Sequence, residues 1–260
     1  MICYFSCTGN TRWAAEELGK ALDEELVDMS TTEPSSLFSS TEVGSLGICI
    51  PVHGWRPPVF VREWLSRADF SKCRIDYCWA LLTAGDTLGE SALLLEHQLS
   101  AKGLRLDSMF SLLMPESYVG LPFMDVDTAA NELRKVTKAR EALQAYKSAI
   151  ESRDRGIRNL HIGRWPRINS RILGGAFEHW LLTDNPFHVK GDKCTGCGTC
   201  VRHCPMGNMT MGTDRMPQWT HSGRCLSCFA CYHHCPTHAI EYGSRTSGKG
   251  QYYFGKKQNL

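Results

Sequence analysis

Eight cysteines in the last third of the chain have the spacing of metal ligands. They form two runs of the pattern C-x2-C-x2-C-x3-C-P, at Cys194, Cys197, Cys200 and Cys204 before Pro205 and at Cys225, Cys228, Cys231 and Cys235 before Pro236. Three thiolates separated by two residues each allow one short loop to wrap three corners of an iron-sulfur cube, and the fourth corner must come from elsewhere. The proline after each fourth cysteine restricts the backbone and ends the loop.

Structural zinc and disulfide bonds account for this pattern less well. Zinc uses four thiolates in two C-x2-C pairs and has no need of a third cysteine at the same spacing. The double run resembles the ligand pattern of bacterial two-cluster ferredoxins, in which each fourth cysteine crosses to the other cluster. That resemblance implies two [4Fe-4S] clusters, one held by Cys194, Cys197, Cys200 and Cys235 and the other by Cys225, Cys228, Cys231 and Cys204.

Length and charge limit the class of protein. At 260 residues the chain is long enough for one sizeable core and a small module. A net charge of +2 gives no reason to expect a nucleic-acid partner. No apolar run reaches the roughly 18 residues of a transmembrane segment, and the start MICYFSCTGNT lacks the pattern of a secretion signal.

Of 13 cysteines, five lie outside the two runs: Cys3, Cys7, Cys49, Cys73 and Cys78. An odd remainder in apolar segments suits reduced thiols better than a disulfide framework, so we expect a cytoplasmic protein. Cys7 stands at an expected helix start, where a thiolate is stabilised. A redox-sensing thiol is therefore an alternative there to a small loop residue.

Strands and helices alternate over the first 150 residues. We expect strands at 1–6, 25–29, 45–50, 75–83 and 104–114, and helices at 13–22, 58–67, 87–101 and 126–150. This alternation predicts a parallel sheet covered on both faces, because parallel neighbours need crossover connections. Ligands bind such sheets outside the carboxyl ends of the strands, so the loops after the first, third and fourth strands are candidate sites.

The first of these loops, residues 6–11 with the sequence SCTGNT, suits a phosphate group. It offers hydroxyl and amide side chains, a glycine that allows close approach, and N–H groups at a helix start. A capped helix start without a ligand is the alternative, because Ser, Thr and Asn are favoured there in any case.

The other two loops could flank a flat ring. Residues 51–58 carry His53, Gly54 and Trp55 among prolines, and a stiff loop with an aromatic side chain suits stacking on an isoalloxazine ring. Residues 83–89 carry glycines that let backbone N–H groups approach a ring edge. Ordinary packing of the aromatic and an ordinary strand-to-helix turn are the alternatives.

Residues 1 to about 150 resemble flavodoxin, whose phosphate loop reads [ST]-x-T-G-N-T. The resemblance implies a doubly wound α/β fold with a parallel sheet of five strands in the order 2-1-3-4-5, and FMN as the cofactor. It assigns the phosphate to Ser6, Thr8, Gly9, Asn10 and Thr11, and it places His53, Gly54, Trp55, Gly85 and Asp86 near the ring.

The whole chain resembles the flavodoxin-ferredoxin fusion proteins labelled EFR-type ferredoxins, including Met114-Pro115 and Tyr118 after the fifth strand. The resemblance implies four segments: a flavodoxin-like domain at 1–152, a helical, Arg-rich connection at 153–187, a small α+β two-cluster ferredoxin domain at 188–243, and a tail at 244–260. The loop after the third strand is basic and proline-rich, where flavodoxins are usually acidic or small. The partner is therefore not implied.

The connection contains six arginines followed by an apolar group, and Gly174 and Gly175 are expected to interrupt a helix within it. We expect its apolar face to pack the two domains together. A docking surface for an acidic electron donor or a membrane is the alternative. Between the two cysteine runs, residues 208–211 and 216–219 are expected to pair as a hairpin.

These features predict an electron-transfer iron-sulfur flavoprotein that passes electrons between FMN and the clusters, to or from a redox protein or a small acceptor. A flavin exchanges one or two electrons and a cluster one at a time, so the pair converts between the two. An enzyme whose flavin reduces a small organic substrate and a redox-sensing regulatory module are the alternatives. No G-x-G-x-x-G follows a strand, so we expect no nicotinamide site.

Overall fold

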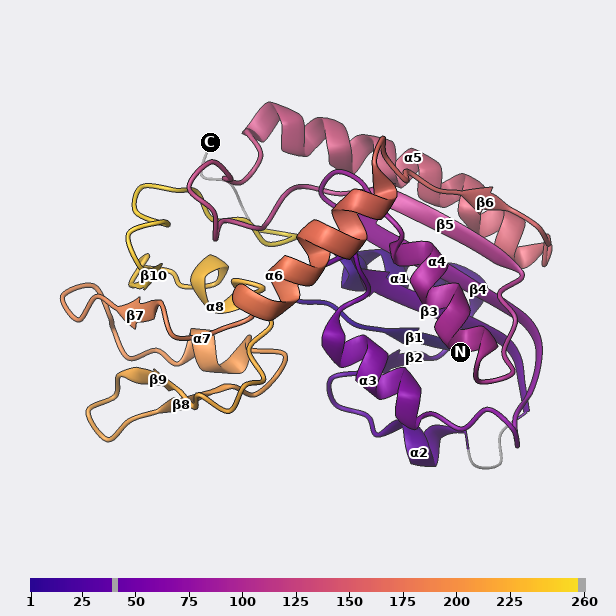
Figure 1. Ribbon diagram of the computed structural model, residues 1–260, viewed down its shortest axis with the longest axis horizontal. Coiled ribbons are helices and arrows are strands. Elements are labelled where there is room, and N and C mark those ends of the chain that lie inside the picture. Colours follow the sequence, from indigo (N-terminus) through magenta and orange to yellow (C-terminus); the bar gives the residue numbers. More distant parts are fainter. Residues whose placement is uncertain (39–41, 257–260) are drawn as a thin grey trace.

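The computed structural model describes residues 1–38 and 42–256 (Figure 1). Six strands form one sheet in which every neighbouring pair is parallel. Their order is β2-β1-β3-β4-β5-β6, which confirms the predicted doubly wound, flavodoxin-like fold. The strands are β1 (Ile2–Tyr4), β2 (Leu26–Asp28), β3 (Glu42–Pro51), β4 (Arg74–Ala84), β5 (Ser108–Leu113) and β6 (Arg158–Asn159).

The expectation of five strands is wrong, because β6 adds a sixth at the edge. It pairs with β5 through Met109 and Phe110, and both of its residues are exposed. Arg158 holds the edge in place by donating to Asp107 O at 3.2 Å and by pairing with Glu96 at 2.7 Å. Two exposed polar residues carry no strand periodicity, so nothing in the sequence marks this strand.

Helices cover both faces of the sheet (Figure 1). Helices α1 (Asn10–Leu22) and α5 (Ala129–Glu151) pack on one face, and α3 (Val59–Arg67) and α4 (Ser91–Ser100) pack on the other, with the short α2 (Pro34–Leu37) beside α3. Strand β1 serves both cores, because Ile2 and Tyr4 face α1 and α5 whereas Cys3 and Phe5 face α3. Burial on both faces explains the continuous apolar character of this strand.

One glycine makes room for the largest side chain in the sheet. Trp79 in β4 is fully buried beside Gly47 in β3, and a Cβ at position 47 would lie 2.3 Å from the indole Cζ2. A large aromatic buries roughly 150–250 Å², which at ~25 cal/mol per Å² corresponds to about 4–6 kcal/mol as an upper estimate. A side chain at position 47 would force this indole out of its place.

A small α+β module packs against the carboxyl end of the sheet (Figure 1). Strand β7 (Phe187–Val189) pairs antiparallel with β10 (Ile240–Tyr242), and β8 (Met209–Met211) with β9 (Pro217–Trp219), which confirms the predicted hairpin. Two short helices complete it, α7 (Thr199–Arg202) and α8 (Ala230–His233). Its core includes Val119, which follows β5, so the two domains share buried contacts.

A single helix crosses between the two domains (Figure 1). It begins with η1, a π-helical stretch at Ile168–Leu173, and continues as α6 (Gly174–Trp180). The expected interruption at Gly174 and Gly175 is wrong, because the helix runs through both residues. A Cβ at Gly174 would lie 2.3 Å from Gly54 O, so this glycine permits close approach to the loop after β3.

The apolar group in the connection is mostly not used for packing. Phe177 turns inward, whereas Ile172, Leu173 and Trp180 are exposed. The expectation that this apolar face joins the two domains therefore applies to Phe177 and not to these three residues. Within residues 1–38 and 42–256, no helix is long and apolar enough to span a membrane.

Candidate functional site

The loops after β1, β3 and β4 meet at the carboxyl edge of the sheet and line one cavity of about 250 Å³. Nine of the ten residues predicted to bind the flavin line it: Ser6, Thr8, Asn10, Thr11, His53, Gly54, Trp55, Gly85 and Asp86. Gly9 is not in the lining, because it packs against Phe254 of the tail. A Cβ added at position 9 would lie 3.1 Å from the Cβ of Phe254. The structure thus brings the three predicted loops together around one space.

The loop after β1 presents a helix N-terminus to this cavity. Gly9 precedes α1 with φ of 94°, a conformation that favours glycine, and no side chain caps the helix. The first intrahelical bond runs from Trp13 N to Gly9 O, so the N–H groups before it have no partner within the helix. Free N–H groups at the positive end of a helix dipole suit a phosphate dianion.

Three predicted phosphate residues already have side-chain partners. Asn10 Nδ2 donates to Pro115 O at 3.1 Å, Thr11 Oγ1 lies 2.8 Å from Thr83 Oγ1, and Thr8 Oγ1 donates to Ser117 Oγ at 3.4 Å. These side chains hold the loop to the carboxyl end of β4 and to the segment after β5. What the loop still offers to a phosphate is its backbone N–H groups at the helix N-terminus.

Two buried hydroxyls in the cavity have no hydrogen-bond partner among the described residues, Ser6 Oγ and Tyr118 Oη. An unsatisfied buried hydroxyl costs about 1–3 kcal/mol. A bound group with polar atoms within reach of these hydroxyls would remove this cost. A flavin nucleotide has such atoms on its phosphate and on its ring edge, so the lining of the cavity fits this group.

Aromatic side chains form the wall of the cavity near the small domain. Trp55 has a φ of 59° and its Nε1 donates to Thr87 Oγ1 at 3.2 Å, which fixes the indole. Tyr118 and Phe177 pack edge to face with ring centroids 5.5 Å apart. Phe177 was not among the predicted site residues, since its helix lies far beyond the loops in the sequence and has an ordinary apolar pattern.

Burial sets the charge of His53 in this wall. It lowers the pKa of His53 to about 4, so the imidazole is neutral at pH 7. The ring Nε2 lies 3.9 Å from Cys7 Sγ.

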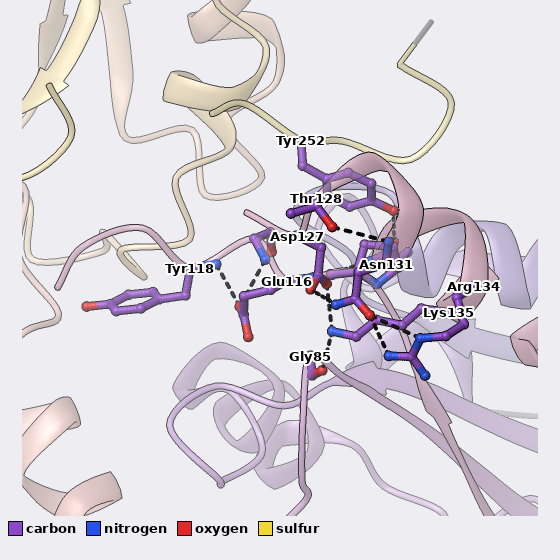
Figure 2. Close-up of polar contacts among 12 residues, drawn as sticks. Gly85, Glu116, Tyr118, Asp127, Thr128, Asn131, Arg134, Lys135 and Tyr252 are labelled. Carbon is purple, nitrogen blue, oxygen red and sulfur yellow. Dashed lines mark hydrogen bonds and ion pairs between the residues drawn. The ribbon is translucent and has the colours of Figure 1, made fainter. Parts of the chain in front are cut away.

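A polar network supports the cavity from behind (Figure 2). Asp127 accepts from Lys135 Nζ at 2.6 Å and from Glu116 N at 2.8 Å, and Lys135 Nζ also donates to Gly85 O at 2.8 Å. Burial by itself would raise the pKa of Asp127, but the hydrogen bonds from Lys135 and Glu116 lower it overall. The network thus ties the loops after β4 and β5 to α5.

The eight cysteines of the double run form two groups of four. Cys194, Cys197, Cys200 and Cys235 line one small cavity, and Cys204, Cys225, Cys228 and Cys231 line another, each of about 20 Å³. Each group takes three cysteines from one run and the fourth from the other. This grouping matches the crossed arrangement of the two-cluster pattern, while ligation itself stays a prediction.

The two cysteine loops have the same backbone conformation despite different residues. Positive φ occurs two and four positions after the first cysteine of each run, and again three positions after the fourth cysteine. The matched pairs are Gly196 and Ser227, Gly198 and Phe229, and Gly207 and His238. Such turns direct backbone N–H groups inward, as a concave anion-binding loop requires.

Backbone N–H groups donate to three of these cysteines. Asn208 N lies 3.3 Å from Cys204 Sγ, Ala239 N lies 3.2 Å from Cys235 Sγ, and Ser227 N lies 3.4 Å from Cys225 Sγ. Hydrogen bonds of this kind stabilise thiolate sulfur and tune cluster potentials. The donor set, free thiols with N–H partners, therefore fits iron-sulfur clusters.

The flavin-type cavity and one cysteine group share a wall. Cys228 lines the 250 Å³ cavity together with Leu226 and Ser227, and Cys7 of the phosphate loop contacts Cys228. Cys197 of the other group is exposed. The three sites therefore run from the sheet edge, through the Cys228 group, to the surface of the small domain.

The tail, described as far as residue 256, holds this arrangement together. Phe254 N donates to Thr8 O at 2.8 Å, and the Phe254 ring stacks on Trp13 with centroids 4.9 Å apart. Gln251 Nε2 donates to Cys235 O at 2.7 Å. The tail therefore contacts the phosphate loop and a cysteine loop at once, and no pattern in residues 244–260 predicts this role.

A doubly wound sheet with a phosphate-type loop, followed by a module with crossed cysteine groups, defines a flavodoxin-like domain joined to a ferredoxin-type domain. Residues 188–236 match the family described as the 4Fe-4S dicluster domain. The predicted combination of a flavodoxin-like fold and an iron-sulfur domain is thereby confirmed. A search of curated proteins found no match to the chain.

Solved structures similar to this chain include rubredoxin oxygen:oxidoreductase from Desulfovibrio gigas, at 18% identity and a TM-score of 0.37, with 57% of this chain and 36% of that chain covered. A flavodoxin from Streptococcus pneumoniae is 13% identical with a TM-score of 0.35, covering 56% of this chain and 97% of that chain. A Methanothermobacter marburgensis NAD(P)H:quinone oxidoreductase is 16% identical with a TM-score of 0.36, covering 56% and 97%. The chain spans about a third of the first of these proteins.

Proposed function

We propose that this protein is an electron-transfer iron-sulfur flavoprotein, in which a flavin at the sheet edge exchanges electrons with clusters in the small domain. The observation that carries the proposal is the shared wall, because Cys228 lines the same cavity as the phosphate-type loop. A flavin exchanges one or two electrons and a cluster one at a time, so their contact converts between the two modes.

The flavin in this proposal is FMN, held by its single phosphate at the N-terminus of α1. The free N–H groups of the loop and the unpartnered Ser6 hydroxyl support this assignment. Trp55, Tyr118 and Phe177 would flank the ring, since all three are aromatic and line the same cavity as the phosphate-type loop.

The clusters in this proposal are two [4Fe-4S] cubes with crossed ligation. Cys204, Cys225, Cys228 and Cys231 hold the cluster beside the flavin, and Cys194, Cys197, Cys200 and Cys235 hold the outer one. The two groups of four and their N–H partners support this assignment. Electrons then pass along one line between the flavin, the Cys228 cluster, the Cys197 cluster and a redox partner at the exposed loop of Cys197.

The size of the cavity favours an electron carrier over a reductase of small organic substrates. Small-molecule sites usually enclose roughly 300–1,000 Å³, and this cavity encloses about 250 Å³. A bound flavin ring would therefore leave little space for a second molecule. All cysteine thiols of the described residues are free, and this supports a reducing, cytoplasmic location.

Anaerobic purification with iron, sulfide and flavin measured on one sample tests the proposal. We expect about eight irons and one FMN per chain, as two [4Fe-4S] cubes and one flavin site require. Iron without flavin, after reconstitution with excess FMN, would contradict the flavoprotein assignment. Flavin with about four irons would contradict the second cluster.

A further inference from the structure

Glu116, which follows β5, places a carboxyl group at the edge of the flavin-type cavity. Its Oε1 accepts from Ser117 N at 2.9 Å and from Tyr118 N at 2.8 Å. Its Oε2 accepts no hydrogen bond within residues 1–38 and 42–256, and Figure 2 shows it pointing away from the supporting network. One carboxyl oxygen is thus fixed by the backbone, and the other is free to meet a ligand.

The carboxyl group is held tightly against the loop after β4. A Cβ at Gly85 would lie 2.2 Å from Glu116 Oε2, so the absence of a side chain at position 85 is what admits the carboxyl. The same two residues are joined from behind, since Lys135 binds Gly85 O and Asp127 while Asp127 accepts from Glu116 N. The position of Oε2 is therefore set before any ligand binds.

The charged groups around Glu116 oppose one another. Burial raises the pKa of Glu116, and the negative charge of Asp127 raises it further. Hydrogen bonds from the backbone of Tyr118 and Ser117 and the positive charge of Lys135 lower the pKa in part. The other titratable groups that line the cavity include the neutral His53, the phenol of Tyr118, the thiol of Cys7 and the exposed carboxyl of Asp86. The raised pKa allows the carboxyl to hold a proton closer to neutral pH than an exposed glutamate does.

We propose that Glu116 is the proton-holding residue of the cavity and exchanges its Oε2 proton with the polar edge of the bound flavin ring as electrons arrive. The inference rests on the proposed function, because clusters deliver electrons without protons whereas flavin reduction takes up both. The O–H bond of Glu116 breaks, a bond from hydrogen to a polar ring atom forms, and the electrons come from the clusters. The Oε2 carboxylate then takes up a proton from bulk solvent, and on reoxidation it first releases that proton to solvent and then accepts the proton of the ring.

Glu116→Gln tests the inference, because glutamine keeps the shape and the Oε1 acceptor but cannot titrate. The measurement is the midpoint potential of bound FMN as a function of pH. We expect the wild-type slope to change at the pKa of the carboxyl, and we expect this change to vanish in Glu116→Gln. Glu141→Gln removes an exposed carboxyl of α5 that lies outside the cavity, and it should keep the change. A change of slope that survives in Glu116→Gln would overturn the inference.

A second measurement separates this inference from the proposed function, because it needs no flavin. Infrared difference spectra of the protein across pH report the carbonyl band of a protonated carboxyl. The titrating band should be present in the wild type and in Glu141→Gln, and absent in Glu116→Gln. If no band disappears in Glu116→Gln, the proton-holding role fails, whether or not FMN binds. If neither the wild type nor the variants bind FMN, the proposed function is refuted instead.

Discussion

Tyr252 Oη donates to Asn10 Oδ1 at 2.6 Å, and both residues are buried. This bond joins the tail to the phosphate-type loop across 242 positions of the chain. Tyr252 N also donates to His233 Nδ1 of the small domain at 3.1 Å. One tail residue therefore sets the position of the loop relative to the cysteine module.

Removing the hydroxyl in Tyr252→Phe should destabilise the protein and weaken flavin binding. Asn10 Oδ1 is left buried without its donor, and this costs about 1–3 kcal/mol. Denaturant unfolding and FMN titration measure the two effects, while the iron content should stay unchanged. Tyr253→Phe is the control, because Tyr253 stacks on His234 and no described residue bonds its hydroxyl. Equal effects of the two substitutions would contradict the role given to the Asn10 bond.

The two neighbouring glycines of α6 should respond in opposite directions to alanine. Gly174→Ala places a methyl group against Gly54 O and should cost about 1–3 kcal/mol, with weaker FMN binding because the loop after β3 must move. Gly175→Ala meets nothing within 4 Å and should stabilise the protein by about 0.4–1 kcal/mol. Thermal unfolding of both variants measures the two effects. Destabilisation by Gly175→Ala would contradict the open space around Gly175 in α6.

Cys204→Ser should damage the cluster beside the flavin, although Cys204 belongs to the first cysteine run. The structure groups it with Cys225, Cys228 and Cys231. Iron analysis should show a loss of roughly half of the iron, as one of two four-iron clusters implies. Electron paramagnetic resonance of the remaining cluster should match that of Cys225→Ser. A match to Cys194→Ser instead would mean that ligation is not crossed.

Acid should destabilise the protein partly through His53. Burial lowers the folded-state pKa of His53 to about 4 from 6.5, so between these values the unfolded chain binds a proton that the folded protein does not. The free energy of unfolding therefore falls as the pH drops from about 6.5 to about 4. Denaturant titrations of the wild type and His53→Gln at several pH values isolate this contribution. The difference between the two proteins should shrink with falling pH, and a constant difference would contradict the buried, neutral state.

Features that depend on local spacing could be predicted from the sequence. The cysteine groups follow from ligand spacing within two short loops, and the phosphate-type loop follows from six consecutive residues between a strand and a helix. The alternation of strands and helices predicted a parallel sheet covered on both faces, and the resemblance to flavodoxin implied the strand order 2-1-3-4-5. A site that needs several residues of particular types near one another in the chain therefore leaves a recognisable pattern in the sequence.

Features that depend on distant partners could not be predicted. Strand β6 consists of two exposed residues whose place is fixed by hydrogen bonds from Arg158 to residues more than 50 positions away. Phe177 and Glu116 reach the cavity from segments that look like an ordinary apolar helix and an ordinary loop. Tyr252 has no signal of its own, because its partner Asn10 lies at the other end of the chain. Only the three-dimensional structure brings these residues to the site.

The central claim is that the flavin site and the Cys228 cluster exchange electrons directly within one chain. The most direct test is to reduce the clusters of the loaded protein with a rapid pulse and to follow the flavin absorbance at several protein concentrations. We predict reduction of the flavin at a rate that does not depend on protein concentration, and loss of this phase in Cys228→Ser. A rate that rises in proportion to protein concentration would show transfer between molecules and would contradict the account.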